Sequence, residues 1–296
     1  MSAGISQNGG GAGTNPESRN FGERLARRMN DLGAVCTGID PHAGLLAAWG
    51  LEDSAAGVRE FGLRTVDALW EHTAAFKPQS AFFERHASRG VAALEDVLEH
   101  CRQAGVPVIL DVKRGDIGST MDGYADAYLS GPLRSDALTV SPYLGPGSLE
   151  KTARRAGANG QGLFVLALTS NPEGASVQHT GGAEHSVAGT VVLAVRDWNR
   201  EIAPGEVGPF GLVVGATIGD AARKLGINLE EFPGIFLAPG VGAQGAGPAE
   251  LREVFGAALP RVLASASRSI LGAGPDASGL RDGFFRTRDE VAEALG

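Results

Sequence analysis

The stretch ILDVKRGDIGST at residues 109–120 runs from an apolar strand directly into a cluster of charges. Side chains at i and i+2 of a strand share a face, so we expect Asp111 and Lys113 to point the same way. Asp116 follows three residues later. Opposite charges at the end of a buried strand are costly to desolvate, and proteins keep them mainly where they neutralise one another or take part in catalysis. The pattern favours an active site over a purely structural ion cluster.

The elements that must position this cluster alternate along the chain. Helical periodicity is present at residues 21–33, 60–72 and 91–105, between short apolar or β-branched runs. We predict strands at residues 35–40, 73–81, 107–113, 137–143, 162–170, 211–217, 234–239 and 261–266. Strands alternating with helices indicate an α/β fold with right-handed βαβ units and a parallel sheet. Eight units in this length predict a single (β/α)₈ TIM barrel.

An open doubly wound sheet is the alternative to the barrel. Polar residues at nearly every predicted strand end favour the barrel, because its active site gathers at those ends. No composition break marks a second domain, so we expect the barrel to span residues 19–296. Residues 1–18 are rich in Gly, Ser and Asn and predict a flexible tail without the features of a secretory signal.

Composition and charge argue against several classes of function. The formal net charge of −8 disfavours nucleic-acid or anionic-membrane binding, which needs a basic surface. No run of about 18 apolar residues is present to cross a bilayer. Cys36 and Cys101 are the only cysteines, so neither a disulfide framework nor a cysteine metal cluster is indicated, and a reduced cytoplasmic setting is expected.

Two loops near the end of the chain suggest a phosphate site. PGVGAQGAG at residues 239–247 follows the seventh predicted strand, and SASRSILGAG at 265–274, with Arg268, follows the eighth. In (β/α)₈ barrels these two loops frequently bind phosphate through backbone N–H groups. Asp40 and Lys77, at the ends of the first two predicted strands, would face the same opening as Asp111 and Lys113.

A long polar loop follows the fifth predicted strand. Residues 169–189 are rich in Gly and lie at the expected catalytic face, which favours a mobile lid over an idle insertion. His179 and His185 lie within it. Their spacing and the lack of paired carboxylates favour solvated histidines over metal ligands, so no metal site is predicted.

The motifs together resemble a known family. DVKRGDIGST resembles the Asp-x-Lys-x-x-Asp-Ile-x-x-Thr signature of orotidine 5′-phosphate decarboxylase, and FKPQSAFFE and PGVGAQGAG resemble its longer bacterial branch. The similarity runs from about residue 21 to the end of the chain, with the elements in the family's order. One departure is visible: the position before the phosphate arginine is commonly Gly, and this chain has Ser267.

The resemblance implies a role for each matching residue. It makes Asp111, Lys113 and Asp116 the catalytic charged array, and Asp40 and Lys77 the residues that bind the ribose hydroxyls. Asp116, Ile117 and Thr120 would reach into the neighbouring subunit's site. Ser170 would contact the pyrimidine, while the loop from Pro239 with Gln244, together with Arg268, would hold the phosphate.

The implied activity is decarboxylation of orotidine 5′-monophosphate to uridine 5′-monophosphate (UMP) and CO₂, the closing step of de novo pyrimidine synthesis. It would need no metal or organic cofactor and would be carried out by a cytoplasmic homodimer. Two alternatives remain open at this point: a metal-dependent phosphosugar lyase or epimerase on the same barrel, and a phosphate-binding module without chemistry.

Overall fold

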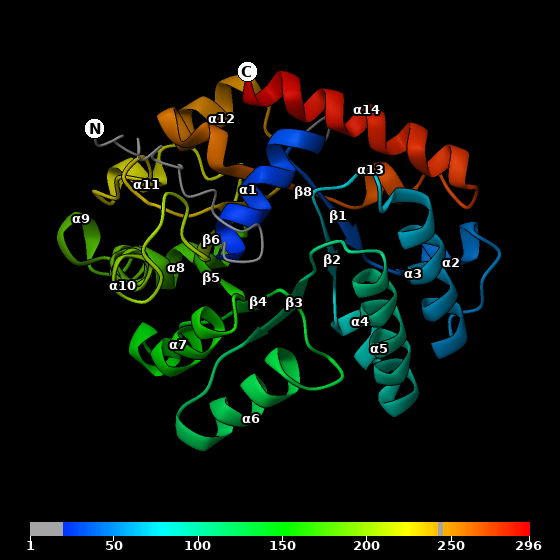
Figure 1. The fold of residues 1–296 in the computed structure, drawn as a ribbon. Helices are drawn as coiled ribbons and strands as arrows, with labels where there is room; N and C mark the ends of the chain where they lie inside the picture. Colours follow the sequence, from blue (N-terminus) through cyan, green and yellow to red (C-terminus); the bar gives the residue numbers. More distant parts are fainter. Residues whose placement is uncertain (1–19, 242–244) are drawn as a thin grey trace, which may run out of the picture.

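Eight parallel strands form one sheet in a computed structural model that describes residues 20–241 and 245–296 (Figure 1). The strand order is β2-β1-β8-β7-β6-β5-β4-β3. Bridges from Phe76 to Val108 and from Gln79 to Asp111 join β2 to β3, so the sheet closes on itself. The strands are β1 (Val35–Ile39), β2 (Ala75–Pro78), β3 (Ile109–Arg114), β4 (Ala137–Val140), β5 (Gly162–Leu168), β6 (Phe210–Val214), β7 (Phe236–Pro239) and β8 (Val262–Ala266). The predicted (β/α)₈ barrel is confirmed.

Helices surround the barrel. They are α1 (Phe21–Leu32), α2 (Ala43–Ala48), α3 (Ala55–Leu69), α4 (Ala81–Glu84), α5 (Ala87–Gln103), α6 (Gly118–Leu129), α7 (Glu150–Ala158), α8 (Ala175–Gln178), α9 (Gly182–His185), α10 (Val187–Glu201), α11 (Ala221–Lys224), α12 (Pro248–Phe255), α13 (Arg268–Leu271) and α14 (Ala277–Leu295). Short 3₁₀ turns lie at Pro146–Leu149, Pro172–Gly174 and Gly256–Arg261. The helices predicted at 21–33, 60–72 and 91–105 correspond to α1, α3 and α5.

Two apolar layers hold these elements together. One lies between the strands and the outer helices and contains most of the large buried side chains. The other fills the barrel itself, where Phe21 and Leu25 of α1 pack among inward-pointing residues such as Ile109 and Phe164. Because these partners belong to the N-terminal parts of their strands, α1 covers that end of the barrel and leaves the opposite end for the site.

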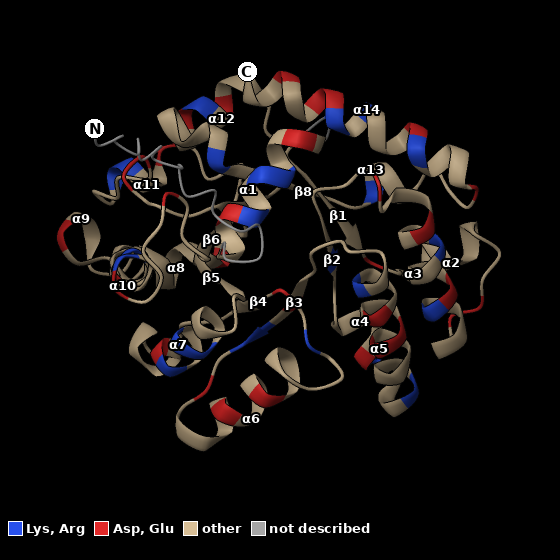
Figure 2. Ribbon diagram, in the orientation of Figure 1, with Lys and Arg blue, Asp and Glu red and all other residues tan. Residues whose placement is uncertain are grey.

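Charge is distributed according to this layering. Lys, Arg, Asp and Glu of both signs lie on the outer helices, whereas within the sheet they concentrate on β2 and β3 (Figure 2). Both cysteines are free and buried, and burial raises the pKa of the Cys36 thiol to about 12. No helix in the described part of the chain is long and apolar enough to cross a membrane.

The observed strands end earlier than predicted at several C-terminal ends. β2 ends at Pro78, β4 at Val140 and β5 at Leu168, where the prediction continued by two or three residues. Of the residues just beyond these ends, Gln79 lines the cavity described below. The predicted lid region contains α8, α9 and a 3₁₀ turn. The tail predicted at residues 1–18 lies outside the described residues.

Candidate active site

A cavity of about 680 Å³ opens at the C-terminal ends of the strands. Five of the sequence-predicted residues with charged side chains line it: Asp40, Lys77, Asp111, Lys113 and Arg268. Pro239, Gly240, Val241 and Gly245 of the β7 loop also line it. The loop that was predicted to hold phosphate and the charged strand ends therefore line one cavity.

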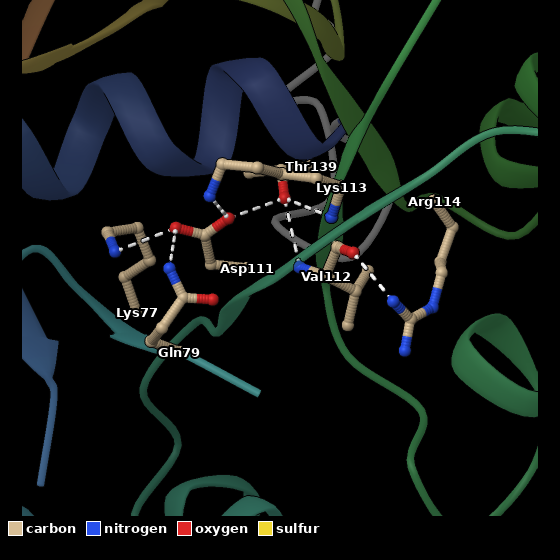
Figure 3. Close-up of polar contacts among 7 residues, drawn as sticks. All are labelled: Lys77, Gln79, Asp111, Val112, Lys113, Arg114 and Thr139. Carbon is tan, nitrogen blue, oxygen red and sulfur yellow. Dashed lines mark hydrogen bonds and ion pairs between the residues drawn. The ribbon is translucent and has the colours of Figure 1, made fainter. Parts of the chain in front are cut away.

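Asp111 is the centre of the polar network in this cavity (Figure 3). Its Oδ2 accepts hydrogen bonds from Lys77 Nζ at 3.1 Å and from Gln79 Nε2 at 3.0 Å. Its Oδ1 accepts from Thr139 Oγ1 at 2.8 Å and from the ammonium of Lys113. Lys77 and Asp111 are only 8% and 6% exposed, so the pair is desolvated as well as bonded.

An irregularity in β3 brings Lys113 into position. Leu110 pairs with Leu138 of β4, but the next pair is Arg114 with Val140, so three residues of β3 face Thr139 alone. Thr139 Oγ1 accepts the N–H groups of Val112 and Lys113, each at 3.0 Å, which the shifted ladder leaves without a strand partner. Lys113 has φ = 45°, a left-handed conformation that is uncommon outside glycine and often found at functional sites.

The electrostatics keep this array charged. Burial raises the pKa of Asp111, but the nearby Lys77 and Lys113 outweigh it, and the pKa is lowered to about 2. For Lys77, burial lowers the pKa and the negative charges of Asp111 and Asp40 more than compensate, so its pKa is raised. Two cations therefore flank one carboxylate that stays ionised over the physiological range.

The predicted site residues that follow β3 lie outside this cavity. Asp116, Ile117 and Thr120 do not line the cavity, and the Asp116 carboxylate accepts the N–H of Ile117 at 2.8 Å. Ile117 is 61% exposed. Within one chain, the structure brings together Asp111 and Lys113 but leaves Asp116 outside their network.

Of two other predicted site residues, Ser170 and Gln244, the structure describes only the first. Ser170 is exposed and does not line the cavity; it lies against Gly215, where an added Cβ would be 3.0 Å from Ser170 Cβ. Gln244 lies outside the described residues.

The cavity wall includes polar residues that were not predicted from the sequence, among them Gln79, Thr139 and Arg286. Gln79 and Thr139 bond Asp111 directly, and Arg286 of α14 lines the cavity beyond Arg268. Gln79 follows Lys77 by two residues, so the same strand alternation that selected Asp111 and Lys113 could have identified it. Thr139 and Arg286 depend on contacts between distant elements and have no local signal.

No group of three or more His, Cys, Asp or Glu among the described residues is placed to hold a metal ion. His185 is exposed and His179 is partly exposed.

The barrel, the cavity at its strand ends and the ionised Lys-Asp-Lys array are those of a TIM-barrel enzyme, and the loops after β7 and β8 are where such barrels frequently bind phosphate. The model of the "Orotidine 5'-phosphate decarboxylase / HUMPS family" matches residues 34–282. The chain belongs to this family.

Individual relatives agree with this assignment. The orotidine 5'-phosphate decarboxylase of Streptomyces coelicolor is 52% identical over 279 residues, covering 93% of this chain and 98% of the relative. The Corynebacterium glutamicum enzyme of the same name is 42% identical over 271 residues, covering 90% and 96%. Among solved structures, Leishmania donovani OMP decarboxylase has a TM-score of 0.75 at 29% identity, covering 94% of this chain and 99% of that one. A crystal structure from Streptomyces avermitilis has a TM-score of 0.86 at 52% identity, covering 93% and 96%.

Proposed function

We propose that this protein decarboxylates orotidine 5′-monophosphate to UMP and CO₂. The observation that carries the proposal is the ionised Asp111 held between Lys77 and Lys113 at the mouth of the barrel. The relatives at 52% identity that bear the enzyme's name support it. A cytoplasmic location and independence from metals and organic cofactors belong to the same proposal.

The chemical difficulty is a carbanion at C6 of the pyrimidine, which no adjacent carbonyl can delocalise. Asp111 would face the substrate carboxylate and disfavour the ground state, and Lys113 would stabilise the developing charge and deliver a proton to C6. At about 4 Å and an effective dielectric constant near 20, one such charge interaction contributes roughly 4 kcal/mol. Charges placed in advance can therefore supply a substantial part of the barrier reduction.

The other residues would bind the distant parts of the substrate. Asp40 and Lys77 would hold the ribose, Ser170 the pyrimidine, and Gln244 and Arg268 the phosphate, with Pro239 at the start of the phosphate loop. Binding energy from the phosphate would order the loops around the site, so a substrate without its phosphate should lose turnover as well as affinity.

We further propose a homodimer in which Asp116, Ile117 and Thr120 complete the partner's site. The segments after β3 and β4 lie side by side, as the hydrogen bond from the Ser141 N–H to the Arg114 carbonyl at 2.8 Å shows. These segments expose large apolar side chains: Ile117 at 61%, Tyr143 at 79% and Leu144 at 52%. Several large apolar side chains exposed on neighbouring loops are typical of an interaction surface, whereas single exposed ones are common on any protein. They support a second copy of this chain docking at the β3 and β4 loops.

An absorbance assay tests the activity. The purified protein is incubated with orotidine 5′-monophosphate, and loss of the orotate-ring band is followed before and after dialysis against EDTA. We expect decay of the band at a rate that EDTA changes by less than about twofold. A large loss that added metal reverses would instead support the metal-dependent lyase, and an unchanged spectrum together with tight UMP binding would support a binding module.

A further inference from the structure

Two buried polar atoms in the cavity wall have no hydrogen-bond partner. They are Oδ1 of Asp40, just after β1, and Oγ of Ser267, just after β8. Other buried side-chain atoms without partners in the described part of the chain belong to residues that do not line this cavity. Buried polar groups are nearly always satisfied in folded proteins, so a pair left over in one cavity indicates a ligand contact.

Gly38 shows that the two side chains border the same small space. A Cβ placed on Gly38 would lie 2.9 Å from Ser267 Cβ and 3.1 Å from Asp40 Oδ2. Any other residue at position 38 would therefore intrude between Asp40 and Ser267. The Ser267 backbone is also fixed, because its carbonyl accepts the N–H groups of Ile270 at 3.0 Å and Leu271 at 2.8 Å.

The chemistry of the pair selects the ligand group. A carboxylate oxygen only accepts hydrogen bonds, whereas a serine hydroxyl can also donate one. A neutral hydroxyl placed between them can donate to Asp40 and accept from Ser267, which satisfies both atoms at once. We propose that Asp40 and Ser267 together hold one hydroxyl of the substrate ribose, which makes Ser267 a sugar-binding residue. This inference rests on the proposed function.

Charge argues against the phosphate as the partner of Ser267. A phosphate dianion beside the Asp40 carboxylate would be repelled at close range. Arg268, the next residue, is exposed and lines the cavity, and it is the group suited to the phosphate. Ser267 thus lies next to Arg268 in the chain and borders the same space as Asp40 at Gly38.

Calorimetric titration with nucleotide analogues tests this assignment. Wild type, Ser267→Ala and Ser267→Gly are each titrated with UMP, 2′-deoxyUMP, 3′-deoxyUMP and uridine. Both substitutions reduce side-chain size, so neither adds a clash at Gly38. Ser269→Ala is the matched control, because Ser269 lines the same cavity but its hydroxyl already accepts from Thr287 Oγ1 at 3.1 Å.

We expect both Ser267 variants to bind UMP about tenfold more weakly, as for one lost hydrogen bond of about 1.4 kcal/mol. For one of the two deoxynucleotides, loss of Ser267 should change affinity less than about twofold, because the shared hydroxyl is already gone. The Ser269→Ala control should show no such dependence on the ribose. Uridine binding should weaken as UMP binding does.

Other outcomes would overturn the proposal. Equal weakening for UMP and both deoxynucleotides means that Ser267 does not touch a ribose hydroxyl. Weakening for UMP but not for uridine assigns Ser267 to the phosphate. Unchanged affinity in both Ser267 variants removes the contact altogether. Failure of the wild-type protein to bind UMP would refute the proposed function itself, and with it this inference.

Discussion

At the residue scale, Lys113 is the group whose removal should separate chemistry from binding. Lys113→Ala is expected to reduce turnover by at least about 1,000-fold, because it removes both the stabilising charge and the proton donor. UMP affinity should change little, since the proposed phosphate and ribose contacts lie at Arg268, Asp40 and Lys77. Steady-state assay and calorimetry measure the two effects. Lys224→Ala, which breaks an exposed ion pair with Asp220, is the control. Undiminished turnover in Lys113→Ala would refute the mechanism.

Thr139 should act by holding Asp111 and the β3 backbone in place. Thr139→Val keeps the shape of the side chain but loses one donor and the acceptor of two N–H groups. We expect a decrease in kcat of roughly 10- to 100-fold with a much smaller change in UMP affinity. Thr139→Ser retains the oxygen and should restore most of kcat, whereas equal activity of the two variants would rule out this positioning role.

The ionisation of Asp111 should appear in the acid stability of the protein. Its folded pKa, about 2, lies below its ordinary value of 3.8. Such a carboxylate stabilises the fold at pH values above its pKa in the unfolded chain. This contribution is lost as the pH falls from about 4 toward 2. Denaturant unfolding of wild type should therefore lose about 2 kcal/mol more across this window than Asp111→Asn. Parallel pH profiles would contradict the assignment.

At the element scale, the apolar runs predicted the strands, and the i, i+2 rule placed Asp111 and Lys113 on one side of β3. The rule predicted correctly that Asp111 and Lys113 meet, but it assumed a regular strand, and β3 is not regular there. The left-handed Lys113 and the shifted register depend on Thr139, which lies 26 residues further along the chain. Likewise, Arg286 reaches the cavity only because α14 packs beside α13. Contacts of this kind leave no trace in local periodicity, so the core of the site was predictable and its supports were not.

Helix α1 offers a test of how far stability and activity are separable. Leu25 is fully buried in the inner core at the end of the barrel opposite the site. Leu25→Ala should reduce the free energy of unfolding by about 2–5 kcal/mol through the cavity it leaves. Turnover per folded molecule should remain at the wild-type level. Arg27→Ala, on the exposed side of α1, should change stability by no more than about 0.5 kcal/mol. A Leu25→Ala enzyme that stays stable but loses turnover would show that α1 shapes the site.

At the scale of the whole molecule, one chain does not bring together all the charges of the proposed array. Lys77, Asp111 and Lys113 meet in the cavity, but Asp116 lies outside it on a loop that also exposes Ile117. A two-fold interface through the β3 and β4 loops would place the same surface of each chain against the other. Each site would then receive Lys113 from one chain and Asp116 from the other.

Mixed dimers test this division. Lys113→Ala and Asp116→Asn chains, each inactive alone, are denatured together and refolded, with each variant refolded alone as the control. A mixed dimer concentrates both substitutions in one site and leaves the other site wild type. Random association makes about half of the dimers mixed, each with one working site of two, so the mixture should regain roughly a quarter of wild-type activity. If separately tagged chains prove that heterodimers have formed and the mixture stays inactive, Asp116 serves the site of its own chain.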